Sequence, residues 1–385
     1  MDKIDELLTR GVANVIPGKE ALEKVLRSDH KLNIYCGFDV TASHLHIGNA
    51  VPLRKLQQFV ELGHHVTFLI GDFTTLVGDT SDKETERPVI SEDQIEKNWQ
   101  DYASQAGKVL ELSKITIQRN SEWLSILSPA DFIRLTRRFS LNDFISRELI
   151  KKRLASNESI NLSEVLYPAL QGYDSYHLDT DIQVGGTDQT FNMQAGRTLQ
   201  KQLRNKDTFV MSFNFLTGTD GRKMSKSWGN AIWLDDQPND MFGKIMSVKD
   251  ELIDEYFTLA TNLPVPNIQD LASGVLHPME LKKKLAWQIV SELHSKDAAN
   301  SAQKHFESTI QAGEIPQDIA GISVKSTNIV DVLVETKLAS SKSAARRLIE
   351  QKGVKINSSP ASLDNQVTSG DILSAGNRKF IKILI

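Results

Sequence analysis

The sequence contains very little cysteine, and Cys36 is the only one. A disulfide within the chain is therefore excluded, and a reducing compartment such as the cytoplasm is expected. No apolar run approaches the roughly 18 residues that a membrane-spanning helix needs, so no membrane segment is predicted. The acidic start, Met1 to Glu6, lacks the basic and then apolar pattern of a signal peptide. No cluster of cysteine and histidine has the spacing of a metal site, so no metal ligand is predicted.

Net charge is also small, at −4 over 385 residues, which argues against non-specific binding to nucleic acid. The charge is unevenly distributed, however. The residues from Ser340 onward include eight basic and three acidic side chains, an excess of five, which leaves −9 for the rest of the chain. Such a basic end indicates a local contact with a polyanion, although a solvated basic face would have the same composition.

The first half of the chain alternates short apolar runs with longer helical patterns. Strands are expected at residues 32–38, 65–70, 115–117, 181–184 and 209–213, and a helix at 48–61. Strands separated by helix-length segments are typical of a doubly wound parallel sheet, which binds ligands at the carboxyl ends of its strands. The predicted fold class is therefore α/β, with a Rossmann-like catalytic domain over residues 1–232.

Three further regions are predicted from the pattern that follows. A charge-rich helical insertion occupies residues 123–166 of the sheet domain. An all-helical domain spans residues 233–320, with helical patterns at 241–258, 278–295 and 298–306. Residues 316–318 and 323–328 are expected to form a linker to a small α+β domain over 329–385, which carries a helix at 341–351 and several short strands.

The first chemical motif, Leu45-His46-Ile47-Gly48-Asn49, follows a predicted strand and opens a helix. A helix N-terminus offers free N–H donors and the positive end of the helix dipole. Gly48 would let a flat base stack against the backbone, while His46 and Asn49 would donate hydrogen bonds to a phosphate. A histidine that only caps the helix is the alternative.

The second motif, Gly221-Arg222-Lys223-Met224-Ser225-Lys226-Ser227, is a polar loop after the last expected strand. Two lysines spaced by three, each closely followed by a serine, can surround a pyrophosphate with charges and hydroxyl donors. An exposed basic turn is the alternative.

Together the two motifs, in this order and in an α/β chain, resemble the class I aminoacyl-tRNA synthetases. Three stretches resemble the tyrosine-specific branch of that family in its bacterial form: Tyr35–Ala42, Tyr167–Asp174 and Gly185–Gln189. The resemblance covers essentially the whole chain. It implies that ATP is a substrate, with Mg²⁺ on its phosphates, and that L-tyrosine and tRNA(Tyr) are the other partners. It also implies a homodimer, for which the insertion over 123–166 is the expected interface unless it packs within one chain.

The chemistry of the amino-acid site can be followed in the residues. Tyr35 and Asp174 could meet a phenol from two sides, and buried polar partners would reject phenylalanine because they would be left unpaired. Tyr167, Gln171 and Asp174 are spaced by four and three, so one helix face would present all three. The residues expected to bind tyrosine are Tyr35, Asp79, Tyr167, Gln171, Asp174 and Gln189.

The ATP site is expected to include glycines that admit the ribose and Asp188, which can accept from ribose hydroxyls. Its predicted members are Gly37, Asp39, His46, Gly48, Asn49, Gly185, Asp188, Lys223, Met224, Ser225, Lys226 and Ser227. The tyrosine carboxylate would attack the α-phosphate in line, with no covalent enzyme intermediate. The residues expected to stabilise that step are Thr41, His46, Asn49, Lys223 and Lys226.

The last domain resembles a small RNA-binding fold of the ribosomal S4 type. Its predicted contacts with tRNA phosphates are Lys342, Arg346, Arg347, Lys352, Lys355, Arg378 and Lys379. Two positions depart from the family pattern. Asn49 replaces the second histidine of the first motif, and the loop at Gly78–Asp82 has Thr80 and Asp82 where proline and glycine are usual.

Three alternative functions share some of these features. The tryptophan-specific branch has the same catalytic fold, but the pair Tyr35 and Asp174 suits a phenol better than an indole. A non-catalytic RNA-binding protein would not need the intact Lys-Met-Ser-Lys-Ser loop. A nucleotidyltransferase with the first motif would not need the basic end domain.

Overall fold

The computed structural model describes residues 2–41, 43–79, 91–225, 228–272, 276–311, 321–357, 359–375 and 379–385. The chain forms two compact units, Met1–Gln237 with Lys244–Ser295 and Pro238–Gly243 with Lys296–Ile385. Within the described ranges, no helix is both long and apolar enough to cross a membrane. The finer boundaries at 1–232, 233–320 and 329–385 remain predictions.

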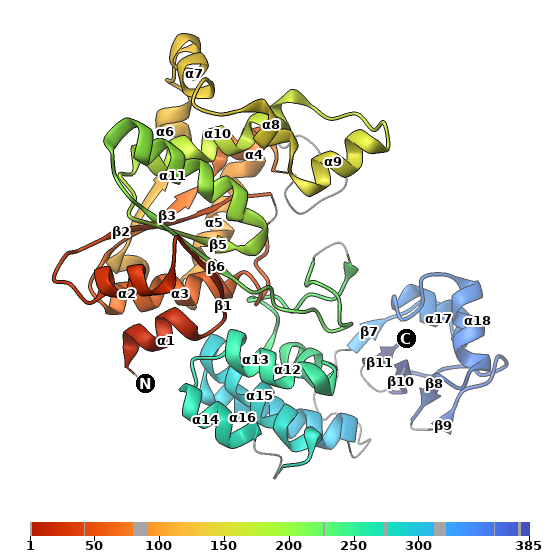
Figure 1. Cartoon of the computed structure of the whole chain (residues 1–385). Helices are drawn as coiled ribbons and strands as arrows, with labels where there is room; N and C mark the ends of the chain where they lie inside the picture. Colours follow the sequence, from red (N-terminus) through yellow and green to blue (C-terminus); the bar gives the residue numbers. More distant parts are fainter. Residues whose placement is uncertain are drawn as a thin grey trace. The chain divides into compact units, whose positions relative to one another are not determined.

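Six strands form the sheet of the first unit, in the order β1-β6-β5-β2-β3-β4 (Figure 1). Their bounds are β1 Val12–Ile16, β2 Asn33–Phe38, β3 His65–Ile70, β4 Thr116–Arg119, β5 Ile182–Gly186 and β6 Phe209–Phe213. The strands from β6 to β4 pair in parallel, whereas β1 pairs antiparallel with β6 at the edge. The predicted doubly wound parallel sheet is confirmed, and β1 is an additional strand.

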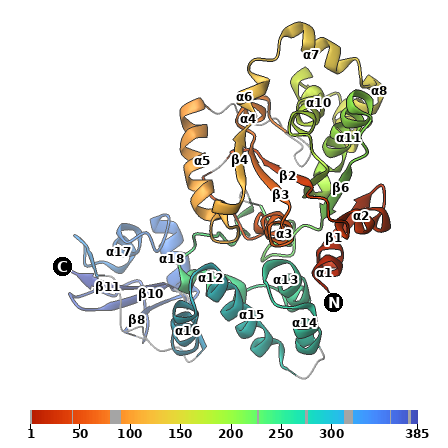
Figure 2. The same cartoon turned by 90° about the vertical axis from the view of Figure 1, so that its left-hand side faces the viewer.

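Helices cover both faces of this sheet. Helix α3 packs on β2 and β3, while α11 packs on β5 and β6 beside α10, and Figure 2 shows the two sets on opposite sides. Buried apolar residues of α3 recur at helical spacing, which fixes its inner face: Ala50, Leu53, Leu56 and Phe59. The helices are α1 Lys3–Thr9, α2 Lys19–Leu26, α3 Ala50–Glu61, α4 Asp72–Val77, α5 Glu92–Ala106, α6 Ser121–Leu124, α10 Leu162–His177 and α11 Thr190–Arg204.

The chain direction across the sheet reverses between β2 and β5. From β2 the chain continues to β3 on one side, and from β5 it continues to β6 on the other. In open α/β sheets a ligand crevice lies at the carboxyl ends of the strands at such a reversal. The segments that leave these two ends carry the first motif, His46 to Asn49, and the stretch Thr187 to Gln189, so both of these predicted ligand segments lie at this point.

The predicted insertion is helical, as expected, with α7 Pro129–Thr136, α8 Leu141–Ile145 and α9 Glu148–Ala155. It is anchored on the body by Phe144, which packs with Val165 and Ala169 of α10. Several large apolar side chains around it remain exposed: Ile126, Ile133, Leu141, Leu154 and Leu162. Singly exposed apolar residues are ordinary, and these five are spread over residues 126–162.

The helices that follow the sheet are α12 Pro238–Met246, α13 Ile253–Ala260, α14 Val265–Ala272, α15 Pro278–Leu293 and α16 Lys296–His305. The helical pattern over 241–258 proves to be two helices, because α12 ends at Met246. The Ser247 hydroxyl donates to the carbonyl of Lys244 at 2.6 Å, a local bond that competes with continuation of the helix.

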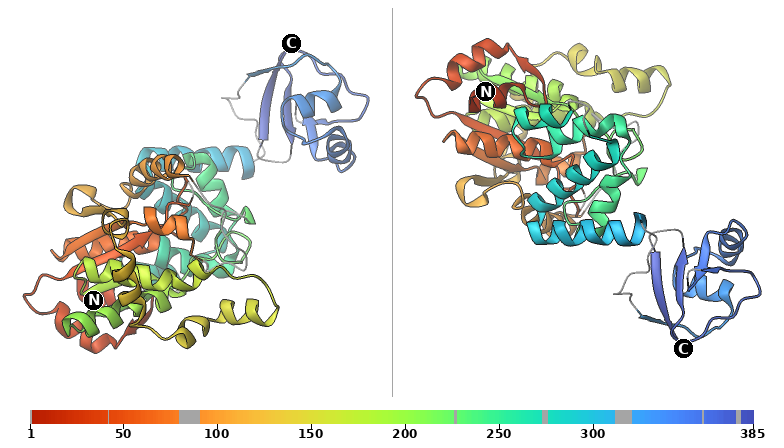
Figure 3. Two further views of the ribbon diagram at one scale, coloured as in Figure 1. Left: turned by 90° about the horizontal axis from the view of Figure 1, so that it is seen from above. Right: turned by 90° about the horizontal axis from the view of Figure 1, so that it is seen from below.

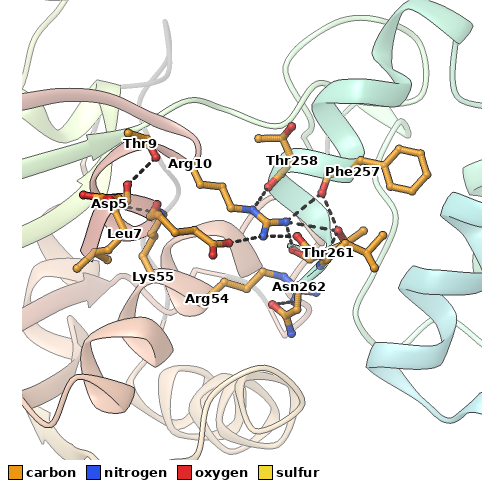
Figure 4. A network of polar contacts seen from close by, with 12 residues as sticks. Asp5, Leu7, Thr9, Arg10, Arg54, Lys55, Phe257, Thr258, Thr261 and Asn262 are labelled. Atoms are coloured by element: carbon orange, nitrogen blue, oxygen red, sulfur yellow. Dashed lines mark hydrogen bonds and ion pairs between the residues drawn. The ribbon is translucent and has the colours of Figure 1, made fainter. Parts of the chain in front are cut away.

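Two buried arginines join α1 and α3 to α13 and α15 (Figure 4). The Arg10 guanidinium donates to carbonyl oxygens at the end of α13, including those of Phe257 and Thr258. The Arg54 side chain, on α3, donates to the Ala260 carbonyl and pairs with Glu292 of α15 at 2.8 Å. These cations occupy the carboxyl end of α13, where unpaired carbonyls and the helix dipole favour positive charge.

The second unit contains a five-stranded sheet in the order β7-β11-β10-β8-β9. Its strands are β7 Gly321–Ser323, β8 Val354–Ile356, β9 Ser359–Pro360, β10 Ile372–Ala375 and β11 Lys379–Leu384. Helices α17 Ile329–Glu335 and α18 Lys342–Glu350 lie together on one side of the sheet (Figure 3). The predicted helix at 341–351 is thus confirmed.

The linker expected at 323–328 is wrong, because these residues are part of the small fold. Strand β7 pairs with β11, Val324 is 5% exposed, and the Asn328 side chain caps α17 by accepting from the Val330 N–H. The stretch is rich in serine, threonine and asparagine because it forms turns and a helix cap. Residues 316–318 lie outside the described residues.

Candidate functional site

The first motif forms a compact turn at the start of α3. The His46 N–H donates to Asn49 Oδ1 at 3.1 Å, and the Asn49 N–H donates to His46 Nδ1 at 3.3 Å. Because Nδ1 accepts, the ring proton lies on Nε2, which is then free to act as a donor. Burial and the nearby Lys223 ammonium lower the pKa of His46 to about 4, so the ring is neutral near pH 7.

Gly48 gives the His46 ring its position. A Cβ at residue 48 would lie 3.0 Å from His46 Nδ1, so a side chain there would displace the ring. The predicted role of Gly48 was to admit a flat base, and the structure adds this contact within the motif. The neighbouring backbone is fixed to residues 232–234, since the Ile47 N–H donates to the Ile232 carbonyl at 2.9 Å.

The predicted phenol partners Tyr35 and Asp174 are both buried. Asp174 accepts from Trp123 Nε1 at 2.7 Å and from Asn120 Nδ2 at 3.1 Å. Burial raises the pKa of Asp174 to about 8, against the lowering effect of these two hydrogen bonds. Sequence reasoning missed Asn120 as a site residue and took Trp123 only as the start of the insertion.

The hydroxyl of Tyr35 lies 3.3 Å from Gln183 Oε1 and 3.4 Å from the Gln171 carbonyl oxygen. Burial raises the pKa of Tyr35 well above its ordinary value, so the hydroxyl stays neutral and can both donate and accept. Apolar residues pack around the ring, including Leu69, Trp123 and Leu170. The result is an apolar cluster with polar groups at one end, as a phenol requires.

A second set of polar side chains adjoins this one through Asp39. The Tyr167 hydroxyl donates to Asp39 Oδ2 at 3.0 Å, and Thr74 Oγ1 donates to Asp39 Oδ1 at 2.9 Å. Thr74 Oγ1 also accepts from Asn120 Nδ2 at 3.0 Å. Asp39, predicted for the ATP site, therefore joins Tyr167 of the predicted tyrosine site to Asn120 and Asp174 in one hydrogen-bonded chain.

Helix α10 presents Tyr167, Gln171 and Asp174 toward the interior. Tyr167 and Asp174 are buried and Gln171 is partly so, which excludes the alternative of a solvent-facing polar side of the helix. Burial raises the pKa of Tyr167 well above its ordinary value, and the nearby carboxylates of Asp39 and Asp79 raise it further. Several carboxylates around one buried hydroxyl suit a cation, such as the α-ammonium of an amino acid.

Asp79 and Gln189 meet at the end of β5. Gln189 Nε2 donates to Asp79 Oδ2 at 2.7 Å, and Asn192 Nδ2 donates to Gln189 Oε1 at 3.1 Å. Both predicted tyrosine-site residues are thus placed together, and Asn192 is an addition that the sequence pattern did not reveal. The departures at Thr80 and Asp82 lie outside the described residues.

The second motif meets the glycine-rich end of β5 through Lys223. Its ammonium lies 3.3 Å from Asp188 Oδ2 and 3.9 Å from the centre of the Phe215 ring. A Cβ on Gly186 would lie 2.5 Å from Asp188 Oδ1 and 3.1 Å from Phe215, so a side chain there would displace Asp188. A Cβ on Gly185 would be 3.3 Å from the Gln189 side chain, a tighter fit than usual.

Met224 is 3% exposed and fixes the loop in the core beside Lys223. Ser225 donates its N–H to Asn230 Oδ1 at 2.9 Å. Lys226 and Ser227, predicted for catalysis and ATP binding, lie outside the described residues. Gly37 is in β2, and the Thr41 N–H donates to the Asp39 carbonyl at 2.9 Å. No group of three or more metal-ligand side chains occurs among the residues described.

The predicted tRNA contacts belong to the second unit. Arg346, Arg347, Lys352 and Lys355 are exposed, while Lys342 pairs with Asp331 at 2.7 Å. Arg378 and the side chain of Lys379 lie outside the described residues.

Comparison with known proteins agrees with this geometry. Residues 27–311 match the family profile of tRNA synthetases class I (W and Y), and residues 328–373 match that of the S4 domain. A tyrosine–tRNA ligase of Dehalococcoides mccartyi is 41% identical over 99% of this chain and 98% of its own length. One of Thermotoga maritima is 37% identical over 98% of this chain and 96% of its own. Among solved structures, a C-terminally truncated mitochondrial tyrosyl-tRNA synthetase of Aspergillus nidulans covers 79% of this chain and 93% of its own, with a TM-score of 0.66 and 22% identity.

Proposed function

Because the chain belongs to the tyrosine–tRNA ligase family of class I synthetases, we propose that it activates L-tyrosine with ATP and transfers it to tRNA(Tyr). The observation that carries the proposal is the buried Asp174 carboxylate, fixed by Trp123 and Asn120 in an apolar cluster that includes Tyr35. A phenol would complete this set of hydrogen bonds. The tryptophan-specific alternative is not supported, since the relatives described above carry the tyrosine name.

The proposed first step joins the tyrosine carboxylate to the α-phosphate of ATP and releases pyrophosphate. The carboxylates of Asp39 and Asp79 would hold the α-ammonium, which places the reacting carboxylate toward α3. The neutral His46 donates from Nε2, and the Lys223 ammonium neutralises charge on the departing pyrophosphate. Thr41, Asn49 and Lys226 are proposed to assist at the phosphates. Mg²⁺ would arrive on the phosphates of ATP and further neutralise their charge.

In the second step the terminal adenosine of tRNA attacks the adenylate, so that tyrosine becomes esterified and AMP leaves. No residue need act as a covalent nucleophile in either step. Catalysis then depends on position and charge, which agrees with a site made of fixed hydrogen bonds.

Pyrophosphate exchange with each standard amino acid tests the assignment. We expect exchange into ATP with tyrosine and none above background with phenylalanine or tryptophan, because phenylalanine has no group to pair with Asp174 and the pair Tyr35 and Asp174 suits a phenol better than an indole. Exchange with tryptophan in the absence of exchange with tyrosine would refute the assignment.

We also propose that α18 and the start of β8 bind tRNA phosphates through Arg346, Arg347, Lys352 and Lys355, together with Lys342, Arg378 and Lys379. Their support is the exposure of the first four and the match to the S4 family. Replacing Arg346 and Arg347 with alanine should weaken tRNA binding and reduce the slope of log K against log salt by about two, because each phosphate contact contributes about one. Tyrosine-dependent exchange of pyrophosphate into ATP should stay at the wild-type rate. An unchanged salt slope would show that these arginines do not contact tRNA.

A homodimer through the insertion is supported by its exposed apolar side chains, among them Ile133 and Leu141 at 60% and 64% exposure. Light scattering should give the mass of two chains, and a glutamate at either position should reduce the measured mass to that of one chain.

A cytoplasmic location is supported by Cys36, which is buried and unpaired, and cell fractionation would test it.

A further inference from the structure

Thr217 is the residue at which the loop of the second motif begins, and α13 holds all of its polar groups. Its N–H donates to Glu255 Oε1 at 2.5 Å, and its hydroxyl donates to Glu255 Oε2 at 3.0 Å. The Tyr256 hydroxyl donates to the Thr217 carbonyl at 2.7 Å. Tyr256 is fully buried, so one of the side chains that hold Thr217 belongs to the core.

Thr217 in turn lies directly opposite the part of the loop that carries the chemistry, and the residues on either side of the pair form the hydrogen bonds. Thr217 and Lys223 form an isolated antiparallel bridge, and the Met224 N–H donates to the Leu216 carbonyl at 3.2 Å. Thr217 therefore sets the position of the Lys223 backbone, and Glu255 and Tyr256 set the position of Thr217.

Asn230 fixes the same backbone from the far end of the loop. Its Oδ1 accepts from the Ser225 N–H at 2.9 Å, and its Nδ2 donates to the Lys223 carbonyl at 3.1 Å and to Asp220 Oδ1 at 2.8 Å. Asn230 is 2% exposed. One buried amide thus bonds the residues on either side of Met224 and the turn before them.

From these contacts we infer that Glu255 and Asn230 are positioning residues for adenylate formation, which act through Lys223 without touching the substrates. The inference rests on the proposed function of Lys223. A charge stabilises a transition state only when it is held where the negative charge develops, so a small displacement of the lysine lowers the rate. Glu255 acts on Lys223 through Thr217, and Asn230 through the carbonyl of Lys223 itself.

The two residues should affect the rate of reaction and leave the binding of tyrosine unchanged. The hydrogen bonds described above join Glu255 and Asn230 to Thr217, Asp220, Lys223 and Ser225, and none of these residues belongs to the Tyr35, Asp174 or Tyr167 cluster. Displacement of a catalytic group by about 1 Å typically costs on the order of a hundredfold in rate. We therefore expect Glu255→Ala and Asn230→Ala to slow single-turnover adenylate formation by about tenfold to a hundredfold.

Conservative variants separate positioning from loss of fold. In Glu255→Gln, the amide oxygen can accept from the Thr217 N–H and the amide nitrogen can donate to the Thr217 hydroxyl, so most of the rate should return. Tyr256→Phe removes only one hydroxyl and should give a smaller loss in the same direction. Glu251→Ala is the matched control, since Glu251 lies just before α13 and its side chain is 71% exposed.

The decisive measurement is the single-turnover rate of adenylate formation in the intact protein, beside the equilibrium dissociation constant of tyrosine. Glu255→Ala and Lys223→Ala are each measured alone and together. If Glu255 acts through Lys223, adding Glu255→Ala to Lys223→Ala should cause little further loss.

Two results would overturn the inference: a wild-type rate in both Glu255→Ala and Asn230→Ala, or an undiminished effect of Glu255→Ala when Lys223 is already alanine. A wild-type rate in Lys223→Ala would overturn the proposed role of that lysine, and the inference with it. Absence of tyrosine exchange in the wild-type protein would instead refute the proposed function, so the failures are distinguishable.

Discussion

Replacing Lys223 with alanine should slow adenylate formation by about a hundredfold to a thousandfold, the usual cost of losing one donor to a developing charge. The Lys223 ammonium lies beside Asp188 and Phe215 at the end of β5, where the ribose and phosphates of ATP are proposed to bind. These two contacts do not involve Tyr35 or Asp174, so the dissociation constant of tyrosine should change little. Rapid-quench measurement at saturating tyrosine and ATP gives the rate, and equilibrium dialysis gives the constant.

Lys201→Ala is a suitable control for this substitution. Lys201 also pairs with an aspartate, Asp207, at 3.0 Å, but its side chain is 53% exposed and lies on α11 outside the site. Its replacement should leave the rate unchanged. An equal loss of rate in both variants would show that the effect is general and does not arise from the phosphate site.

Lys223→Ala should also change the pKa of His46, which can be measured by spectroscopy. The Lys223 ammonium contributes to the low pKa of His46, so its removal should raise that pKa from about 4 toward the ordinary value of 6.5. Burial, the larger cause, remains, so the rise should be partial. Titration of the His46 ring by NMR in the unliganded protein checks this without reference to catalysis.

Replacing Asp174 with asparagine should weaken tyrosine binding by about tenfold to a hundredfold, because a hydrogen bond from the substrate hydroxyl to a charged acceptor contributes roughly 1.5–3 kcal/mol. The carboxylate now accepts from Trp123 through one oxygen and from Asn120 through the other. An amide has only one oxygen, so one of these donors would face an NH₂ group. The substrate hydroxyl would also lose its acceptor. Equilibrium dialysis with tyrosine and phenylalanine should show that discrimination between them falls.

Asp179→Asn is the matched control, because Asp179 follows the same helix and its side chain is 54% exposed in pairs with Lys206 and Arg204. It should bind tyrosine as the wild type does. If Asp174→Asn also did so, the phenol would have to bind elsewhere.

The pH dependence of Asp174 follows from the direction of its pKa shift. Its pKa in the folded protein, about 8, exceeds the ordinary value of 3.8, so the folded state favours the protonated form. The contribution of this group to the free energy of unfolding is therefore complete below pH 3.8 and is lost as the pH rises through about 8.

Tyrosine binding should show the opposite trend, because an ionised carboxylate is the stronger acceptor for the phenol. The affinity should rise between pH 6 and pH 9, with release of protons that calorimetry in buffers of different ionisation enthalpy can measure. Asp174→Asn should abolish the proton release.

Sequence reasoning located the site through residues that are continuous in the chain. His46, Gly48 and Asn49 form a local turn, and Tyr167, Gln171 and Asp174 share one helix, so spacing alone placed them together. Asn120, Trp123 and Thr74 were missed because their role arises from contacts between β4, α6 and α4, which no local pattern encodes.

The same limit explains the errors in the fold. β1 is short and contains Asn14, and its place depends on pairing with β6. The break after Met246 is accompanied by a local bond of the Ser247 hydroxyl, and a stretch of caps and turns at 323–328 has the composition of a linker. Pairing between distant strands and local side-chain hydrogen bonds of this kind are not visible in hydrophobic periodicity or composition.

The buried cations at the end of α13 have a mechanical consequence. Arg54 is on α3, the helix that begins at the His46 turn, and it binds the last residue of α13, Ala260. Two residues near the middle of α13, Glu255 and Tyr256, grip Thr217 and hence the Lys223 loop. The two signature motifs, far apart in sequence, are thus both connected by hydrogen bonds to α13, a helix of eight residues. A shift of α13 would therefore disturb the supports of both motifs at once, the Arg54 contact from α3 and the Thr217 contact from the Lys223 loop.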